Sequence, residues 1–292
     1  MAFSFGIRTS RLGLVLSAAL IPLCLSSCVS KDDDDDTGSS TPVETRYAYD
    51  TCSIVGTGER LKIYGGESCI PGASAMVKIH FVHNSVPDKD GLCTGTALSQ
   101  HEILTAAHCF FDKDMSFTSV EDNHYTPAAV RSGVGDNSIS DWSLHPYFEE
   151  DYNANPNSFD FAIIRTREPL GLATFPLLFS RGARIAEEVL VCGYGHDEGG
   201  VLGAFRVGNS IVTDVDDTHI HVEYDGSGAN PCTGDSGGSV LLSRGGTFAI
   251  AGVTSLGSQV SCGIGDTHHY ASVLQPFVMD WLIANLSDAT TV

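Results

Sequence analysis

A glycine-rich pentapeptide, Gly234-Asp235-Ser236-Gly237-Gly238, contains the serine whose neighbours most favour nucleophilic chemistry. A serine hydroxyl attacks a carbonyl carbon when a base removes its proton and hydrogen-bond donors stabilise the oxyanion that forms. Glycine at 234 lets the backbone N–H groups of residues 234 and 236 point at one position, because no Cβ stands in the way. The same composition is also typical of an ordinary turn. The segment therefore predicts a nucleophile if the chain also supplies a base and an orienting acid.

Two upstream segments carry a candidate base and a candidate acid. His108 follows the run Leu104-Thr105-Ala106-Ala107, and Asp160 precedes the apolar residues 161–164. A carboxylate beside an apolar run is costly to bury unless it is paired, so Asp160 needs a buried partner. An imidazole N–H is a suitable partner, and the pairing leaves the other ring nitrogen free to act as a base. The three side chains together predict catalysis by an activated serine.

The motifs around these residues, and their order, resemble those of the trypsin/chymotrypsin-like serine proteases, peptidase family S1. Residues 105–109 and 234–238 match the histidine and serine motifs of that family, and Asp160 stands where its aspartate opens a strand. The resemblance covers roughly residues 63–286. It implies an all-β fold of two antiparallel six-stranded β-barrels with a C-terminal α-helix.

The same resemblance implies a role for each residue. Ser236 is expected to be the nucleophile, His108 the general base and Asp160 the residue that orients the imidazole, with the N–H groups of Gly234 and Ser236 as the oxyanion hole. The implied reaction is hydrolysis of protein or peptide substrates through an acyl-enzyme, with no cofactor and no metal. Two alternatives stay open, namely a catalytically silent binding module of the same fold and an esterase that uses the same triad.

The segment Lys62-Ile63-Tyr64-Gly65-Gly66 resembles the activation site of the family, with Tyr where Val is usual. Cleavage after Lys62 frees the amine of Ile63, which is charged near neutral pH. That cation can pair with Asp235, whose burial is otherwise unfavourable, and so help to order the oxyanion loop. The sequence therefore predicts a zymogen.

The family's specificity pocket is expected between Asn230 and His268. Asn230 lies six residues before the nucleophile, at the position of the pocket floor, and a neutral amide there disfavours a basic substrate side chain. A separate trypsin-like protease is therefore expected to make the cut after Lys62. Ser255, Leu256 and Gly257 match the strand that pairs with substrate backbone, and His268 is expected near the back wall.

The cysteines follow the family in part. The resemblance implies the disulfides Cys93–Cys109 and Cys232–Cys262, and an extracytoplasmic location is compatible with both. Cys52, Cys69 and Cys192 remain, and three cysteines cannot all pair within one chain. Cys69 is expected to bond Cys192, with Cys52 as its alternative partner.

The N-terminal residues are expected to form three parts of an exported protein. Residues 1–27 read as a signal peptide of the lipoprotein type, because an apolar run ends at a lipobox-like Leu25-Ser26-Ser27-Cys28. Residues 28–62 are an acidic tether and propeptide with a lipid on Cys28, and residues 63–292 are the protease domain. We expect a membrane-anchored protein facing the periplasm or the cell exterior, with plain secretion as the alternative. The net charge of −20 argues against nucleic-acid partners and against membrane contact other than through the lipid.

Short strands must position these residues, because β-branched and apolar runs recur between turn signals without long helical periodicity. The exception is residues 275–286, where an amphipathic helix is expected.

His219 and His221 share a strand face, near the acidic residues Asp214, Asp216 and Asp217. A metal site is possible in either group, but a solvated edge is favoured because neither has a complete ligand set. The expected strands are 76–82, 103–105, 161–164, 189–191, 210–213, 219–222, 239–242 and 248–254.

Overall fold

The computed structural model describes residues 60–61, 67–69, 74–83, 90–110, 115–122, 139–148, 159–259 and 261–292. All of these residues belong to one compact unit, Thr45–Val292. The signal peptide, Cys28, Cys52 and the Lys62–Ile63 cleavage site lie outside the described residues, so they stay predictions. No helix in the described ranges is long and apolar enough to cross a membrane.

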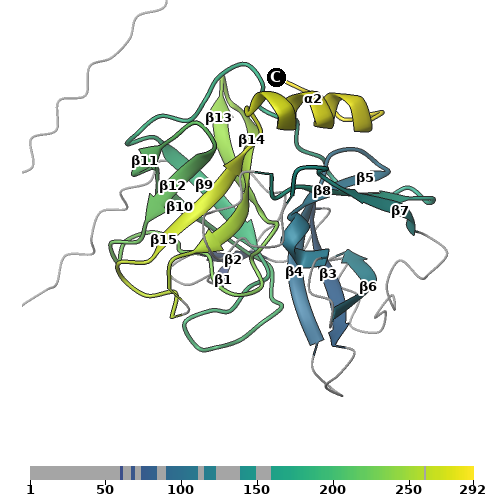
Figure 1. Cartoon of the computed structure of the whole chain (residues 1–292). Helices are drawn as coiled ribbons and strands as arrows, with labels where there is room; N and C mark the ends of the chain where they lie inside the picture. Colours follow the sequence, from purple (N-terminus) through teal and green to yellow (C-terminus); the bar gives the residue numbers. More distant parts are fainter. Residues whose placement is uncertain are drawn as a thin grey trace, which may run out of the picture. The chain divides into compact units, whose positions relative to one another are not determined.

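The first of two antiparallel sheets carries the histidine and the aspartate of the site (Figure 1). Its strand order is β6-β3-β4-β5-β8-β7, and each neighbouring pair is antiparallel. The strands are β3 (Met76–His83), β4 (Asp90–Ala97), β5 (Glu102–Thr105), β6 (Met115–Asp122), β7 (Ile139–Leu144) and β8 (Ala162–Thr166).

The second sheet surrounds the serine loop and has the order β1-β2-β10-β9-β13-β14-β15-β12-β11. Its longest strand, β14, is paired with β13 on one side and with β15 on the other. The strands are β1 (Arg60–Leu61), β2 (Glu67–Cys69), β9 (Glu188–Gly193), β10 (Arg206–Ile211), β11 (Asp214–Val215), β12 (His219–Glu223), β13 (Ser239–Arg244), β14 (Thr247–Gly257) and β15 (Thr267–Ser272).

The expected count of six strands is correct for the first sheet and wrong for the second, which has nine. Short edge strands account for the difference: β1 and β2 extend the sheet beside β10, and β11 extends it beside β12. The described strands thus give a mostly β structure of two antiparallel sheets, which is consistent with the trypsin fold.

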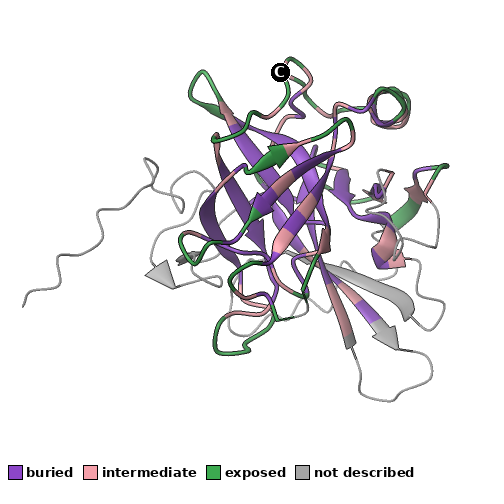
Figure 2. Ribbon diagram, turned by 60° about the vertical axis from the view of Figure 1, so that its left-hand side comes forward, coloured by how far each residue is buried: buried purple, intermediate pink, exposed green. Residues whose placement is uncertain are grey.

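Two groups of buried hydrophobic side chains form the core, and Figure 2 shows that many residues of the strands are buried. Ile103 and Ile163 belong to the first group, and Val222 and Val240 to the second. Each such side chain contributes about 1.5–3 kcal/mol through its removal from water. Strand β5 is buried at all four of its residues, so it lies within this core along its whole length.

Buried polar contacts join the two sheets next to the serine loop. The hydroxyls of Thr96 and Ser239 lie 2.7 Å apart, and the hydroxyl of Thr94 donates to the carbonyl of Gly234 at 3.0 Å. The hydroxyl of Tyr194 donates to the carbonyl of Met76 at 3.1 Å. These bonds fix the position of the serine loop relative to strands β3 and β4 of the first sheet.

A C-terminal helix, α2 (Pro276–Asn285), confirms the expected helix at residues 275–286. Proline at the first helical position suits its fixed φ, and Val278 and Leu282 are buried on the inner face. At the other end, Arg165 of β8 donates to the carbonyl of Asn285 at 2.8 Å, where a cation stabilises the helix dipole. The helix is thus anchored to the first sheet.

Candidate active site

His108 and Asp160 meet through two hydrogen bonds. His108 lies in the 3₁₀ helix η1 (Ala107–Phe110), which begins two residues after β5, and Asp160 lies two residues before the adjacent strand β8. The backbone N–H of His108 donates to Asp160 Oδ1 at 2.8 Å, and His108 Nδ1 lies 2.6 Å from Oδ2. Because an ionised carboxylate only accepts, the proton of the neutral ring is on Nδ1, which leaves Nε2 with a lone pair.

Ser255 of β14 supplies a third hydrogen bond to the same carboxylate. Its hydroxyl donates to Asp160 Oδ2 at 2.5 Å. Asp160 is fully buried, so these donors replace the water that an exposed carboxylate would bind. The sequence places Ser255 only in the substrate-binding strand, and its contact with Asp160 is a second role that sequence reasoning missed.

The environment of His108 changes its basicity in two opposed ways. Burial alone would lower the pKa of His108, but the charge of Asp160 and its hydrogen bond raise the pKa above the ordinary value for histidine. The ring is therefore a stronger base than a free imidazole.

Ser236 lies on a loop that needs glycine on both sides. Gly234 has φ +101° and Gly237 has φ +82°, in the region that residues with a Cβ rarely adopt. A Cβ at 237 would lie 2.1 Å from the hydroxyl of Thr105. Thr94 N–H holds the carbonyl of Ser236 at 2.7 Å, and the N–H of Gly237 donates to the carbonyl of Thr254 at 2.9 Å.

The N–H groups of Gly234 and Ser236 do not donate a hydrogen bond to any residue that the structure describes. The neighbouring N–H groups of Asp235, Gly237 and Gly238 all do. Two free donors on either side of one residue are the arrangement that an oxyanion hole requires.

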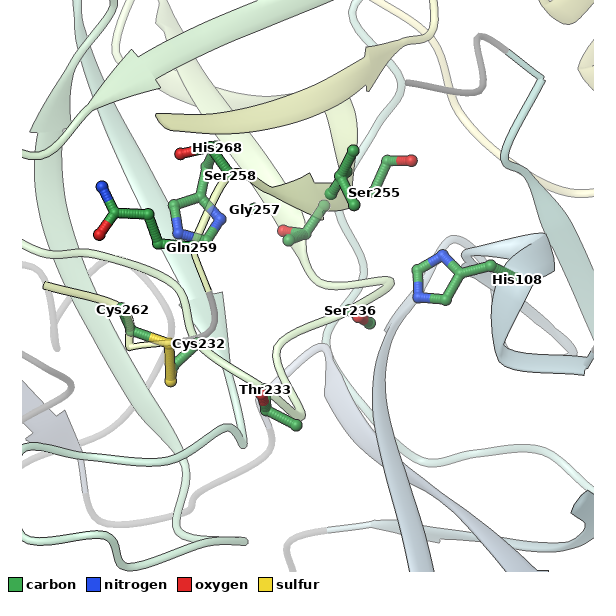
Figure 3. A pocket seen from close by; sticks show the side chains of 12 residues that line it. His108, Cys232, Thr233, Ser236, Ser255, Gly257, Ser258, Gln259, Cys262 and His268 are labelled. Atoms are coloured by element: carbon green, nitrogen blue, oxygen red, sulfur yellow. A yellow bond between two sulfur atoms is a disulfide. The ribbon is translucent and has the colours of Figure 1, made fainter. Parts of the chain in front are cut away.

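A pocket of about 310 Å³ brings the histidine and the serine together (Figure 3). His108 and Ser236 both line it, and the imidazole points toward the serine. The sulfur of Cys109 lies 4.0 Å from His108 Nε2 and 4.0 Å from the carbonyl oxygen of Ser236, so Nε2 is on the side of the nucleophile.

Asp235 is not the unpartnered carboxylate that the sequence predicts. It is buried, and it accepts hydrogen bonds from the N–H of Gly195 at 2.7 Å and of Cys232 at 2.8 Å. Its pKa is raised to about 6 because burial outweighs those bonds and the charges of His268 and Arg206.

Glycines at 193 and 195 make room for this carboxylate. A Cβ on Gly193 would lie 2.0 Å from Asp235 Oδ1, and one on Gly195 would lie 2.4 Å from Oδ2. Sequence reasoning missed both positions, although Cys192-Gly193-Tyr194-Gly195 is a visible signal of close backbone approach.

The pocket walls differ in part from the expectation. Leu256, Gly257 and His268 line the pocket as predicted. Asn230 is not among the lining residues, because it is fully buried and its side-chain amide donates to the carbonyl of Cys262 at 3.0 Å. Its expected place at the floor of the family's specificity pocket therefore stays a prediction.

His268 has a buried acidic partner that the sequence did not reveal. Its Nε2 lies 2.9 Å from Asp266 Oδ2, while Asp266 Oδ1 accepts from the hydroxyl of Ser258 and the N–H of Gln259, each at 2.9 Å. Burial raises the pKa of Asp266, but the bond and charge of His268, with the other two bonds, lower it to about 2. His268 Nδ1 is buried without a hydrogen-bond partner among the described residues.

Two disulfides brace the site, and the expected bridge from Cys69 to Cys192 is not formed. Cys93–Cys109 and Cys232–Cys262 are present as expected. Cys192 is a free, buried thiol, so the favoured Cys69–Cys192 bridge is wrong. Strand β10 lies between β2 and β9, and two strand spacings of about 4.8 Å exceed the reach of a disulfide.

Cys93, His108 and Cys109 bring potential metal-ligating atoms within 4.8 Å of one another. The two cysteines are joined in a disulfide, which removes the thiolates that a metal ion would need. This cluster therefore braces the histidine loop.

The comparisons with known proteins agree with the fold. A protein-family model described as trypsin matches residues 63–282 of the 292-residue chain. The chain therefore belongs to the trypsin family of serine proteases.

Individual relatives are distant. Brachyurin of Leptuca pugilator is 27% identical over 242 residues, covering 75% of this chain and 96% of brachyurin. Spermosin of Halocynthia roretzi is 25% identical over 245 residues, covering 76% of this chain and 62% of spermosin. Ovochymase-2 of Mus musculus is 26% identical over 196 residues, covering 59% of this chain and 31% of its own length. The chain thus spans less than two thirds of spermosin and of ovochymase-2.

Proposed function

We propose that the chain is a serine endopeptidase whose catalytic triad is Ser236, His108 and Asp160. The main observation behind this proposal is that two hydrogen bonds join His108 to Asp160. His108 and Ser236 line the same pocket. Membership of the trypsin family supports the reaction class. The reaction needs no cofactor.

The mechanism is that of the family, applied to these residues. The Ser236 oxygen bonds to the scissile carbonyl carbon while His108 Nε2 takes the hydroxyl proton, and the carbonyl electron pair moves onto oxygen. The N–H groups of Gly234 and Ser236 donate to that oxyanion. Its collapse breaks the C–N bond, and His108 gives the proton to the leaving amine. Water then hydrolyses the acyl-enzyme by the same route, and Asp160 stays ionised throughout.

Activation is proposed to depend on cleavage after Lys62 by another trypsin-like protease. The freed amine of Ile63 would then pair with Asp235. Support comes from the burial of Asp235 and from its raised pKa, since no ion pair joins it to a residue in the described ranges. A cation beside this carboxylate would stabilise its ionised form and the loop that bears the nucleophile.

The pocket is proposed to accept a polar rather than a basic side chain. The backbone of Ser255, Leu256 and Gly257 would pair with the substrate as an added strand, because the ladder of β13 with β14 ends at Val253. His268 would contribute an imidazole to the back wall, held in place by Asp266.

We also propose that the protein is exported and held on a membrane by a lipid on Cys28. The support is the lipobox-like end of the apolar N-terminal run. Metabolic labelling with a palmitate analogue tests it, since a Cys28→Ala variant should lose the label if the proposal is correct.

A fluorophosphonate probe tests the enzymatic proposal. Protein cleaved after Lys62 should be labelled at Ser236, whereas a Ser236→Ala variant and an uncut Lys62→Gln variant should stay near background. Absence of labelling in correctly cleaved protein would instead support the silent binding module. Full labelling of the uncut variant would refute the activation step alone.

Peptide hydrolysis separates the remaining alternative. An endopeptidase should cleave internal bonds in a peptide library, whereas an esterase with the same triad would hydrolyse activated esters and leave the peptides intact.

A further inference from the structure

A histidine cluster outside the proposed active site lies on the adjacent strands β12 and β15 (Figure 1). His221 of β12 is paired across the ladder with His269 of β15, and their ring centroids are 4.8 Å apart. His219 lies two residues along β12, and its ring packs edge-on against His269 at 6.2 Å. His268 points to the opposite face of β15, toward the pocket, so this cluster is separate from the pocket lining.

The two paired histidines face each other through nitrogen atoms. Nδ1 of His221 lies 2.8 Å from Nδ1 of His269. On its other side, His221 Nε2 lies 2.9 Å from Asp216 Oδ2. Because the carboxylate can only accept, His221 carries its proton on Nε2 and presents a lone pair at Nδ1. The contact between the rings therefore depends on one proton, which His269 donates.

That single proton can leave the contact without ionisation of either ring. Neutral imidazole exists as two tautomers, and His269 needs only to carry its proton on Nε2 instead of Nδ1. Both Nδ1 atoms then carry lone pairs between β12 and β15.

The spacing of the two nitrogens matches neighbouring positions around one metal ion. Nitrogens bound at about 2.0–2.1 Å lie about 2.9 Å apart when they subtend 90° and about 3.4 Å apart at the tetrahedral angle. The observed 2.8 Å is close to the 90° value, which is the geometry of tetragonal Cu²⁺ and Ni²⁺ sites. The spacing therefore needs little change, while both rings must turn until their lone pairs converge on the ion.

Asp216 holds His221 in the orientation that a ligand requires. Its carboxylate also accepts from the N–H groups of Thr218 and His219, both at 2.7 Å, and from the hydroxyl of Thr218 at 2.9 Å. Burial opposes its ionisation, but these bonds and the bond to His221 hold the pKa of Asp216 well below its usual range. A carboxylate that fixes the second nitrogen of a histidine is a common support of metal-binding histidines.

We propose that His221 and His269 form a bidentate site for a divalent transition-metal ion, Cu²⁺ or Ni²⁺, with Asp216 as the positioning residue of His221. Both side chains are partly exposed, so water completes the coordination sphere. The site does not depend on the proposed peptidase activity.

Titration calorimetry of the full chain, purified with a tag that contains no histidine, tests the site with NiCl₂. We expect one ion per chain, loss of binding in His221→Gln and His269→Gln, and 10–100-fold weaker binding in Asp216→Asn. His196→Ala removes a histidine from a distant loop and should bind as the unchanged protein does. With CuCl₂, the electron paramagnetic resonance spectrum should show coupling to two imidazole nitrogens.

Thermal unfolding, followed by circular dichroism, provides a second measurement of metal binding that can also be made on a destabilised variant. Ni²⁺ should raise the melting temperature of the unchanged protein and of His196→Ala, and should leave that of His221→Gln unchanged. Binding that survives in both glutamine variants would overturn the proposal, and so would the absence of any Cu²⁺ or Ni²⁺ binding to the unchanged protein.

Discussion

Replacement of Asp160 by asparagine tests the proposed base most directly, because the two side chains have the same shape. The backbone N–H of His108 needs an acceptor at the position of Oδ1, so the amide oxygen takes that position. The amide NH₂ group then occupies the position of Oδ2, where it faces His108 Nδ1 and the hydroxyl of Ser255. A donor at that point favours the tautomer with a lone pair on Nδ1 and the proton on Nε2, which can no longer accept the proton of Ser236.

The size of the expected loss of rate follows from the hydrogen-bond donors that would be left unpaired. In Asp160→Asn, the tautomer that supports catalysis would leave two buried donors facing each other, namely the amide N–H of residue 160 and the Nδ1–H of His108. Each unpaired donor costs about 1–3 kcal/mol. The sum of about 2–6 kcal/mol corresponds to a rate about 30-fold to 10⁴-fold lower. Ser255→Ala is the matched control, because it removes one bond to the carboxylate, about 1.5–3 kcal/mol at most, and keeps the tautomer.

The assay is the second-order rate of fluorophosphonate labelling of Ser236 in protein cleaved after Lys62, which does not require a known substrate. Circular dichroism melts should show that both variants are folded. The reasoning is refuted if Asp160→Asn reacts within threefold of the unchanged protein at pH 7, or if Ser255→Ala loses more activity than Asp160→Asn.

Three further predictions concern pH and packing. The labelling rate should fall on acidification as His108 becomes protonated, with a midpoint above 6.5 because its pKa is raised; a pH–rate profile with a lower midpoint would contradict this. In the uncut chain, the pKa of Asp235 rises from 3.8 when unfolded to about 6 when folded, so the folded state binds the extra proton. The free energy of unfolding should therefore decrease by roughly 3 kcal/mol at most as the pH rises from 4 to 7, and denaturant titrations should show a smaller decrease once a free Ile63 amine pairs with Asp235. Gly193→Ala should destabilise the protein by about 1–3 kcal/mol and slow labelling, since its Cβ would overlap Asp235; Gly182→Ala, where the nearest atom is 3.7 Å away, should leave both measurements unchanged.

Local patterns predicted most of the second sheet. Continuous β-branched and apolar runs gave β9, β12, β13 and β14 within a few residues, because buried strands need such side chains on their inner faces. The run at residues 210–213 was placed too late, since β10 spans Arg206–Ile211. Its residues Gly208 and Asn209 have low strand propensity, and tertiary pairing with β9 overrides that propensity.

Two strands near the site could not be recognised from local composition. Strand β4 contains Gly91 and Gly95, which indicate a break, yet a Cβ at 95 would lie 2.7 Å from the side chain of Ile103. The glycine is there for close packing of two strands and not for a turn. Strand β15 contains His268 and His269 in succession, and each is held by partners that only the fold brings near.

The residues of the candidate site also differ in how well the sequence predicts them. His108, Asp160 and Ser236 are recognisable because each has a distinctive local neighbourhood. The contacts of Ser255 with Asp160, and of Gly195 with Asp235, join residues 95 and 40 positions apart. Such contacts depend on chain crossings that no window of sequence contains. Asn230 was placed by its spacing from Ser236 alone, and the hydrogen bond of its amide to the carbonyl of Cys262 could not be predicted from the sequence.

Ser255 limits how this protein could be redesigned. Its backbone belongs to the strand edge that lines the pocket, while its hydroxyl holds the carboxylate beside His108. In the proposed peptidase, peptide binding and the strength of the base therefore depend on the same residue, so one cannot be changed without the other. A library that varies residues 255–257 to alter selectivity would also alter turnover through position 255. Diversification for new selectivity is better confined to residues 256–259, with Ser255 kept unchanged.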